Sequence, residues 1–277
     1  MIENPSVAWD SAHLTNIGDA IMCEHHDVEE NGLNRRSLLK SVGAMSLLGV
    51  FGSSFLAEEA SAAAKKAGVS AGMVMTEAQR ASMSPDDIIT MMKNGNERFL
   101  KGKNHAHNYL TEQRKTSASG QFPAALILSC IDSRAPAETI MDLGVGDVFN
   151  ARIAGNISND DLLGSMEFAC KVAGAKVILV MGHTKCGAIA GAIAKVELGH
   201  LTGLLDKIKP AVDATSYQGE RSATNNAFVD AVAKKNVELT IADIQSRSTI
   251  LAEMVSAGSL KIVGAMYDID SGTVNFI

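Results

Sequence analysis

Short apolar runs recur along the C-terminal two thirds of the chain, each bounded by polar or glycine-containing segments, and they predict β-strands. The runs occupy residues 124–129, 147–153, 176–181, 260–268 and 273–277. The last two are joined by Asp270-Ser271-Gly272, which is typical of a tight turn. We therefore expect the chain to end in an antiparallel closing strand.

Apolar residues at helical spacing separate most of these strands. They predict a helical turn at 139–143 and helices over 85–102, 160–173, 187–198, 227–247 and 249–257. Strands that alternate with helices indicate an α/β fold, with a central, mostly parallel β-sheet flanked by helices. We expect the polar residues 105–120 to be a connection, and the small residues 63–83 to be a linker or a loosely held N-terminal arm. The folded domain is predicted to span residues 84–277.

The distribution of charge argues against some classes of partner. The chain has 277 residues, 46% of them hydrophobic, which is typical of one soluble globular domain with an extension. Residues 1–62 hold nine acidic and three basic side chains, which equals the net charge of −6, and the rest of the chain holds 22 of each sign. A neutral domain offers no basic field for nucleic acid or anionic lipid. A small neutral substrate needs no such field.

The N-terminal segment has the features of an export signal. Arg35 and Arg36 precede an uncharged stretch, residues 41–57, and Ala60-Ser61-Ala62 then offers an A-x-A cleavage site. This order is typical of the twin-arginine pathway, so residues 1–62 are predicted to be a leader and the mature protein to be periplasmic or otherwise exported. A transmembrane anchor is the alternative, but 17 residues containing several Gly and Ser are short for a membrane span.

Three side chains that commonly bind metals follow two of the predicted strands. Cys130 comes directly after the first strand, and His183 and Cys186 come shortly after the third. The carboxyl ends of parallel strands meet at one edge of a sheet, where ligands collect. Two thiolates and one imidazole form a ligand set that suits Zn²⁺, and three protein ligands leave the fourth tetrahedral position open, as in catalytic zinc sites.

The remaining cysteines bear on the alternative of a closed, structural zinc site. Such a site would need a fourth protein ligand, but Cys23 lies in the predicted leader and Cys170 in an apolar helical pattern. We expect Cys170 to be a buried core thiol, and we expect no disulfide. Cys186 begins a predicted helix, whose backbone N–H groups favour its thiolate form.

The two metal-binding segments, Cys130-Ile131-Asp132-Ser133-Arg134 and His183-Thr184-Lys185-Cys186, resemble those of the β-class carbonic anhydrases. Further similarity lies in 84–99, in Arg152-Ile153-Ala154-Gly155-Asn156 and in 263–272, so the resemblance runs from about residue 85 to the C-terminus. It implies one Zn²⁺ per chain, held by Cys130, His183 and Cys186. The implied reaction is the reversible hydration of CO₂ to bicarbonate and a proton by zinc-bound hydroxide.

The resemblance also implies roles for residues around the metal. Asp132 and Arg134 are expected to form a catalytic dyad, in which Arg134 holds the carboxylate bidentately and keeps it ionised. The residues expected to bind substrate are Gln121, Phe149 and Gly187. Phe168 stands where plant-type members have tyrosine. The alternatives are a surface ion pair for the dyad and ordinary core packing for the two phenylalanines.

Gln121 supports a prediction about assembly. It lies nine residues before Cys130, with a strand between them, which places it more than about 20 Å from its own zinc end. It can bind substrate only at the site of a neighbouring subunit, so we expect a homodimer or a dimer of dimers; the alternative is a loop glutamine without a role. Members with an allosteric bicarbonate pocket often carry tryptophan where this chain has Ile127, which favours the plant-like subtype.

Other assignments remain open at this point. Hydrolysis of COS or CS₂ is an alternative activity on the same fold, and a non-catalytic bicarbonate-binding zinc protein is a further one, although such a protein would be expected to lose Asp132 or Arg134. His105 and His107 lie in the polar connection, and we expect them to be solvated side chains rather than proton shuttles.

Overall fold

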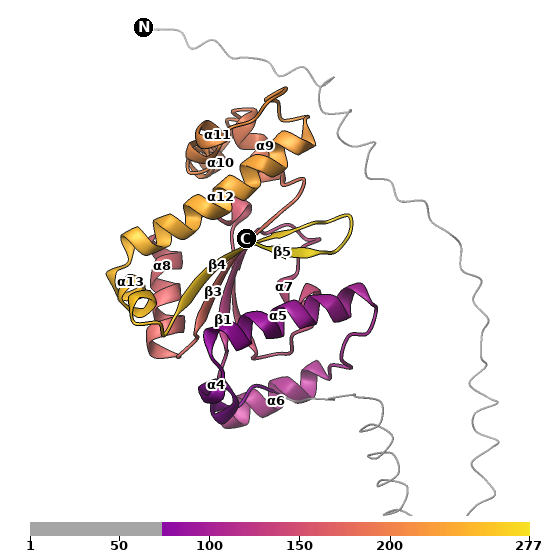
Figure 1. The fold of residues 1–277 in the computed structure, drawn as a ribbon, viewed down its shortest axis with the longest axis vertical. Coiled ribbons are helices and arrows are strands. Elements are labelled where there is room, and N and C mark those ends of the chain that lie inside the picture. The colour runs from indigo at the N-terminus through magenta and orange to yellow at the C-terminus, as the bar shows by residue number, and fades with distance from the viewer. Residues whose placement is uncertain (1–73) are drawn as a thin grey trace, which may run out of the picture. The chain divides into compact units, whose positions relative to one another are not determined.

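Helices and strands occupy most of residues 74–277, the part of the chain that the computed structural model describes. Their arrangement is shown in Figure 1. The predicted leader, residues 1–62, and the first part of the predicted linker, residues 63–73, lie outside the described residues. Among the helices of residues 74–277, none has both the length and the apolar character needed to cross a membrane.

Within residues 74–277, five strands form a single sheet in the order β2-β1-β3-β4-β5. β2, β1, β3 and β4 pair in parallel, and β5 is antiparallel to β4. The strands are β1 Ala125–Ser129, β2 Val148–Arg152, β3 Val177–His183, β4 Lys261–Tyr267 and β5 Val274–Phe276. The predicted α/β class, with a mostly parallel sheet and an antiparallel closing strand, is confirmed.

Helices connect these strands and cover both faces of the sheet (Figure 1). The α-helices are α4 Glu77–Ser82, α5 Pro85–Leu100, α6 Tyr109–Ser119, α7 Ala137–Ile140, α8 Asp160–Glu167, α9 Gly187–Ile193, α10 Gly199–Asp206, α11 Lys209–Ala214, α12 Asn226–Arg247 and α13 Thr249–Ser256. A short 3₁₀ turn, η2, spans Ala154–Asn156, and a π-helical turn, η3, spans Phe168–Val172.

The strands alternate their side chains between two hydrophobic cores, because successive residues of a strand point to opposite faces. Ile127 and Leu179 belong to the core that contains Ile88 and Met92 of α5. Leu128 belongs to the other core, which packs against α8, α12 and α13. β1 and β3 are buried along their whole length, as continuous apolar strands between two helical layers should be.

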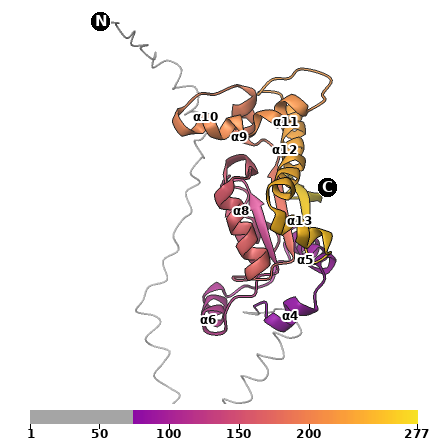
Figure 2. The same ribbon diagram turned by 90° about the vertical axis from the view of Figure 1, so that its left-hand side faces the viewer.

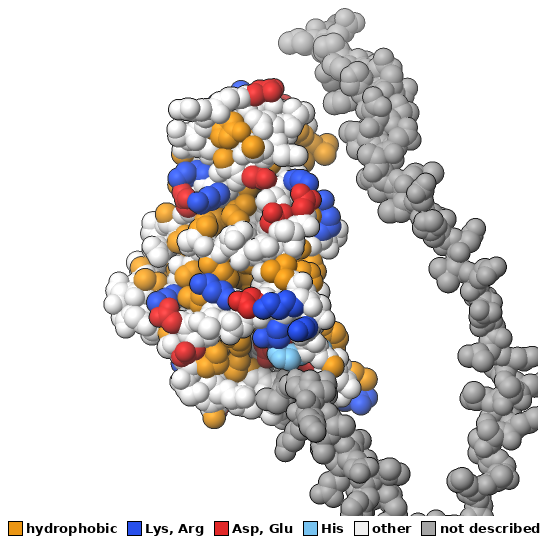
Figure 3. All heavy atoms as spheres, turned by 45° about the vertical axis from the view of Figure 1, so that its right-hand side comes forward, with side chains coloured by type: hydrophobic (Ala, Val, Ile, Leu, Met, Phe, Trp, Pro, Cys, Tyr) orange, Lys and Arg blue, Asp and Glu red, His pale blue; other side chains and the backbone are white. Residues whose placement is uncertain are grey.

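The two ends of the sheet are covered by different helices. α9, α10 and α11 gather beyond one end, whereas α4 and α6 lie at the opposite end (Figures 1 and 2). β3 runs toward the end with α9, since α9 follows β3 in the chain. On the face drawn in Figure 3, basic and acidic side chains are interspersed, in keeping with the neutral charge balance of this part of the chain.

Two segments expected to lack regular structure contain helices. α6 lies within the predicted polar connection, and Glu112 is its only buried residue, so no apolar stripe marks it in the sequence. α4 lies within the predicted linker or arm, and Lys176 anchors this region by donating hydrogen bonds to the backbone oxygens of Arg80, Ala81 and Met83. Residues 74–83 of the predicted linker or arm thus contact the domain through Lys176.

Other element boundaries also differ from the prediction. The predicted helix over 160–173 divides into α8 and the π-helical turn η3. α9 ends at Ile193 rather than at residue 198, and the sequence pattern did not predict α10 and α11. All three are short helices of six to eight residues, too short to show a clear apolar period.

Candidate metal centre

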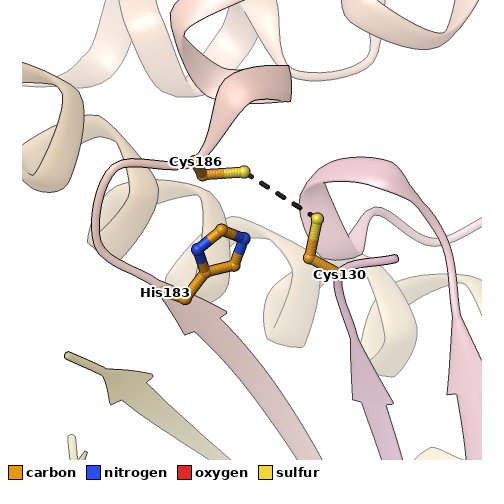
Figure 4. Close-up of side chains that lie close together, drawn as sticks. All are labelled: Cys130, His183 and Cys186. Carbon is orange, nitrogen blue, oxygen red and sulfur yellow. Dashed lines mark hydrogen bonds between the residues drawn. The ribbon is translucent and has the colours of Figure 1, made fainter. Parts of the chain in front are cut away.

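The strand order brings Cys130, His183 and Cys186 together at the carboxyl edge of the sheet. β1 and β3 are neighbours, with Ser129 in register with Met181, so the residues after β1 lie beside the end of β3. His183 is the last residue of β3, and Cys186 is the residue that caps α9. The three side chains point toward one another (Figure 4), and their ligand atoms all lie within 4.8 Å of each other.

The spacing of the two sulfur atoms suits a metal between them. Cys130 Sγ and Cys186 Sγ are 3.9 Å apart, far beyond the length of about 2.05 Å for a disulfide bond. Two zinc–thiolate bonds of about 2.3 Å at a tetrahedral angle place the sulfur atoms about 3.8 Å apart. All three side chains are buried, with Cys130 4% exposed and the other two 1%.

The imidazole of His183 presents a free nitrogen to the two thiols. Its Nδ1 lies 2.9 Å from the backbone oxygen of Thr184, which can only accept, so Nδ1 carries the proton. Nε2 is then the nitrogen with the lone pair, and this buried atom has no hydrogen-bond partner among the described residues. An unpaired buried nitrogen costs free energy unless something binds it, so His183 fits the requirements of a metal ligand.

The two thiols also influence each other's ionisation. The Cys186 S–H group next to Cys130 lowers the pKa of Cys130, and the same contact raises the pKa of Cys186. Cys130 is thus the more readily ionised of the two, and Cys186 keeps its proton. A divalent cation bound between them would convert both to thiolates, with release of a proton. By contrast, burial raises the pKa of Cys170 to about 12, which identifies it as the predicted core thiol. Cys130, Cys170 and Cys186 are all free thiols in residues 74–277.

Asp132 lies at the mouth of this cluster and is held by Arg134. Arg134 Nε and Nη2 donate to the two carboxylate oxygens at 3.0 and 2.8 Å, and the Arg134 backbone N–H adds a third bond at 2.9 Å. These bonds lower the pKa of Asp132 to about 2. Its Oδ2 lies 4.0 Å from His183 Nε2, so the ionised carboxylate is close to the position where a metal would sit.

Arg152, in β2, fixes the backbone of the Cys130–Asp132 segment. Its Nε donates to the Cys130 backbone oxygen at 2.9 Å, and its Nη2 donates to the Asp132 backbone oxygen at 2.5 Å. In the sequence, Arg152 is evident only as part of a motif. Its function was not evident because the contact depends on the pairing of β1 with β2, in which Ser129 is in register with Arg152.

Comparison with known proteins identifies the family. The family model "Carbonic anhydrase" matches residues 125–274. The chain belongs to the β-class carbonic anhydrases. Carbonic anhydrase 2 of Mycobacterium tuberculosis is 37% identical over 186 residues, which cover 65% of this chain and 87% of the relative. The carbonic anhydrase of Mycolicibacterium smegmatis is 33% identical over 184 residues, 66% of this chain and 88% of the relative.

Solved β-carbonic anhydrases share the fold. The structure of CafA of Aspergillus fumigatus aligns with a TM-score of 0.53 at 29% identity, over 60% of this chain and 80% of that one. The Coccomyxa enzyme in complex with acetazolamide aligns with a TM-score of 0.54 at 27% identity, over 59% and 75% of the two chains. A tetrameric β-carbonic anhydrase of Sordaria macrospora aligns with a TM-score of 0.52 at 27% identity, over 61% and 89%.

The residues expected to bind substrate in this carbonic anhydrase are not all brought together in one chain. Gly187, the first residue of α9, is exposed beside Cys186, and the space next to its Cα is open. Gln121 is exposed and precedes β1, at the opposite end of that strand from Cys130. Phe149 is in register with Leu126 and packs edge-on against Phe168, with ring centroids 6.4 Å apart.

A second group of metal-ligating side chains was not predicted. His105, His107 and Asp142 also place their ligand atoms within 4.8 Å of one another. The expectation that both histidines are solvated was wrong for His107, whose side chain is 12% exposed. His107 lies between Asp142 and Glu112, whose side chains are fully buried, at 3.3 Å from an Asp142 oxygen and 3.1 Å from a Glu112 oxygen.

Proposed function

We propose that this β-carbonic anhydrase binds one zinc ion per chain through Cys130, His183 and Cys186 and catalyses the reversible hydration of CO₂ to bicarbonate and a proton. The observation that carries the proposal is the convergence of two thiols on a buried imidazole nitrogen that has no other partner within residues 74–277. The donor set and the sulfur spacing both suit tetrahedral zinc with one position left open. When bound, zinc supplies a nucleophile at neutral pH by lowering the pKa of a coordinated water toward about 7.

The chain's own residues orient the reaction. Asp132 accepts the hydrogen bond of the attacking water through its carboxylate, which directs a lone pair of that oxygen toward CO₂. It can do so across the working pH range because Arg134 keeps its pKa at about 2. Arg134 donates to both oxygens of this carboxylate, at 3.0 and 2.8 Å, and so holds Asp132 in place. Arg152 keeps the segment that carries both groups in register with β2.

The proposed activity is tested by stopped-flow CO₂ hydration on protein whose zinc content has been measured. We expect turnover in proportion to zinc, with COS as a poor competitor. Zinc-loaded protein without CO₂ hydration, or with faster turnover of COS, would contradict the assignment of substrate.

We further propose that the active form is at least a homodimer, in which Gln121 completes the partner's site. The position of Gln121 supports this, since six residue steps from residue 124 to Cys130 already span about 20 Å. Exposed apolar side chains near β2 and η3 offer surface for such an interface: Ile131 is 61% exposed, Phe168 53% and Val172 72%.

The shared site is tested by mixing two inactive variants. Chains with Gln121→Ala keep their zinc but lack the glutamine. Chains with Cys186→Ala lack zinc but keep Gln121. A heterodimer of the two has one zinc site served by an intact Gln121, so mixing should restore activity. No recovery above the Gln121→Ala homodimer would show that each site is built within one chain.

We also propose export through the twin-arginine pathway, with residues 1–62 as the leader. The support is the Arg35-Arg36 pair, the uncharged stretch and the A-x-A site in the sequence. In a bacterial host with this pathway, Arg35→Lys combined with Arg36→Lys should leave the precursor in the cytoplasm, although the charge is unchanged. An unchanged periplasmic yield would point to another route.

A further inference from the structure

A buried asparagine of α12 reaches the turn that follows β2. Asn236 is 3% exposed, and its Nδ2 donates a hydrogen bond of 2.7 Å to the backbone oxygen of Gly155 in η2. Most of its neighbours on the buried face of α12 are apolar, among them Val232, Ala233 and Val237. A polar amide in such surroundings costs free energy unless its hydrogen bonds are made, so packing alone does not explain an asparagine here.

Gly155 in turn contacts the metal centre. Its backbone N–H donates to Cys130 Sγ at 3.4 Å. Gly155 has φ of +69°, and a Cβ at this position would lie 2.6 Å from Ile208 Cδ1. Two hydrogen bonds therefore hold this residue, one to the sulfur of Cys130 and one from the amide of Asn236, and the side chain of Ile208 leaves no room for a larger residue.

We propose that Asn236 is a positioning residue for the metal centre, which acts through Gly155 on the thiolate of Cys130. By holding the Gly155 carbonyl, Asn236 fixes one of the two peptide planes that meet at the Gly155 Cα, and this restricts the rotations that would turn the N–H group in the other plane away from Cys130 Sγ. An N–H group aimed at a thiolate stabilises its negative charge and fixes the direction of its lone pairs. This inference rests on the proposed zinc ligation by Cys130, and it adds a partner 106 residues away in the sequence.

The test compares variants of Asn236 with a matched control on the same helix. Asn236→Leu has a similar shape without a donor, and Asn236→Ala removes the side chain. Thr240 lies one turn further along α12, is 5% exposed and lines the same surface cavity of about 660 Å³, so Thr240→Val is the control. Zinc affinity is measured by competition with a chelator, and the cobalt-substituted proteins are compared by their thiolate-to-cobalt charge-transfer absorption.

Both Asn236 variants should bind zinc about tenfold or more weakly and shift the charge-transfer band, which is the usual effect of removing such an outer partner. Thr240→Val should change neither. Unfolding of the zinc-free proteins separates positioning from general stability. Wild-type zinc affinity and cobalt spectrum in a folded Asn236→Leu protein would overturn the proposal, as would equal zinc loss in a Thr240→Val protein of equal stability.

A measurement on the unaltered protein applies if neither Asn236 variant folds. In ¹⁵N spectra of the wild type, the side-chain amide of Asn236 and the backbone amide of Gly155 should both shift when zinc is removed by a chelator. An Asn236 resonance that does not respond to zinc would overturn the proposal. CO₂ hydration by the wild type is measured separately. A protein that binds zinc without hydrating CO₂ would contradict the proposed function, but the effect of Asn236 on zinc binding could still be tested.

Discussion

The Cys130–His183–Cys186 cluster and the His105–His107–Asp142 cluster meet the same distance requirement, since the ligand atoms of each lie within 4.8 Å of one another. They differ in whether those atoms are already bonded. In the first cluster His183 Nε2 has no hydrogen-bond partner in the described part of the chain. In the second, Asp142 accepts hydrogen bonds from Arg98 Nε at 2.5 Å and from the His105 backbone N–H at 3.0 and 3.2 Å. Its carboxylate also contacts the imidazoles of His105 and His107.

The surroundings of Asp142 also disfavour a cation. A guanidinium at 2.5 Å already neutralises the carboxylate and would repel a metal ion placed beside it. Glu112, the nearby acid, accepts from Val145 N–H at 3.0 Å and lies 3.1 Å from His107 Nδ1. The network connects α5, the segment before α6, α6 itself and the residues that follow α7, so we interpret it as a structural clamp. Proximity of ligating atoms is therefore not sufficient for a metal site; their lone pairs must also be free.

The largest expected difference between the clusters is in zinc content. Cys186→Ala should leave the purified protein without stoichiometric zinc and without CO₂ hydration, because the site loses one of three ligands. Cys170→Ala is the matched control, since it removes an equally buried thiol outside the cluster. Metal analysis of both proteins decides the matter. Zinc retained at one per chain in Cys186→Ala would remove this residue from the ligand set.

The same aspartate-to-asparagine change should have opposite effects in the two regions. Asp132→Asn should keep zinc and stability but lose roughly 10²-fold in CO₂ hydration, because the amide cannot accept the hydrogen bond of the attacking water as a carboxylate does. Asp142→Asn should keep the activity per zinc. Stopped-flow rates normalised to zinc test both. Near-normal hydration by Asp132→Asn would leave Asp132 without the proposed function.

Asp142→Asn should instead lower stability, by about 2 kcal/mol, because hydrogen bonds to a buried charged group are lost. Burial alone raises the pKa of Asp142, but the bonds from Arg98 and His105 outweigh it and lower the pKa below 3.8. A carboxyl group whose pKa is lower in the folded state than in the unfolded state stabilises the fold when the pH is above the unfolded-state pKa, about 3.9 for aspartate. This contribution is lost as the pH falls through the folded-state pKa. Urea unfolding from pH 7 to pH 3 should therefore show a shallower acid decline in Asp142→Asn. An equally steep decline would contradict the clamp.

The smallest effects are expected from the histidines of the second cluster. His105→Gln removes one ring contact with Asp142, and His107→Gln removes up to two, with Glu112 and Asp142. Each such hydrogen bond contributes roughly 1 kcal/mol. Zinc content should stay at one per chain in both variants. A fall from two metal ions to one on either substitution would show that the second cluster binds a metal after all.

The sequence predicted the first cluster well and the second poorly, for physical reasons. Cys130, His183 and Cys186 follow strands whose apolar runs are unambiguous, and parallel strands place such residues at one edge. His105 and His107 lie between two helices, one of which has a single buried residue and thus no apolar period. Asn236 and Arg152 were missed as well, because their contacts with Gly155, Cys130 and Asp132 depend on tertiary packing that local patterns do not encode.

Zinc K-edge X-ray absorption of the purified, unaltered protein tests the central claim most directly, because it reports the atoms bound to the metal without any substitution. The account predicts one zinc per chain with two sulfur neighbours at about 2.3 Å and one or two nitrogen or oxygen neighbours at about 2.0–2.2 Å. A zinc shell of nitrogen and oxygen alone would exclude Cys130 and Cys186 as ligands and point to the His105–His107–Asp142 cluster. That result would contradict the conclusion that only the Cys130–His183–Cys186 cluster binds a metal.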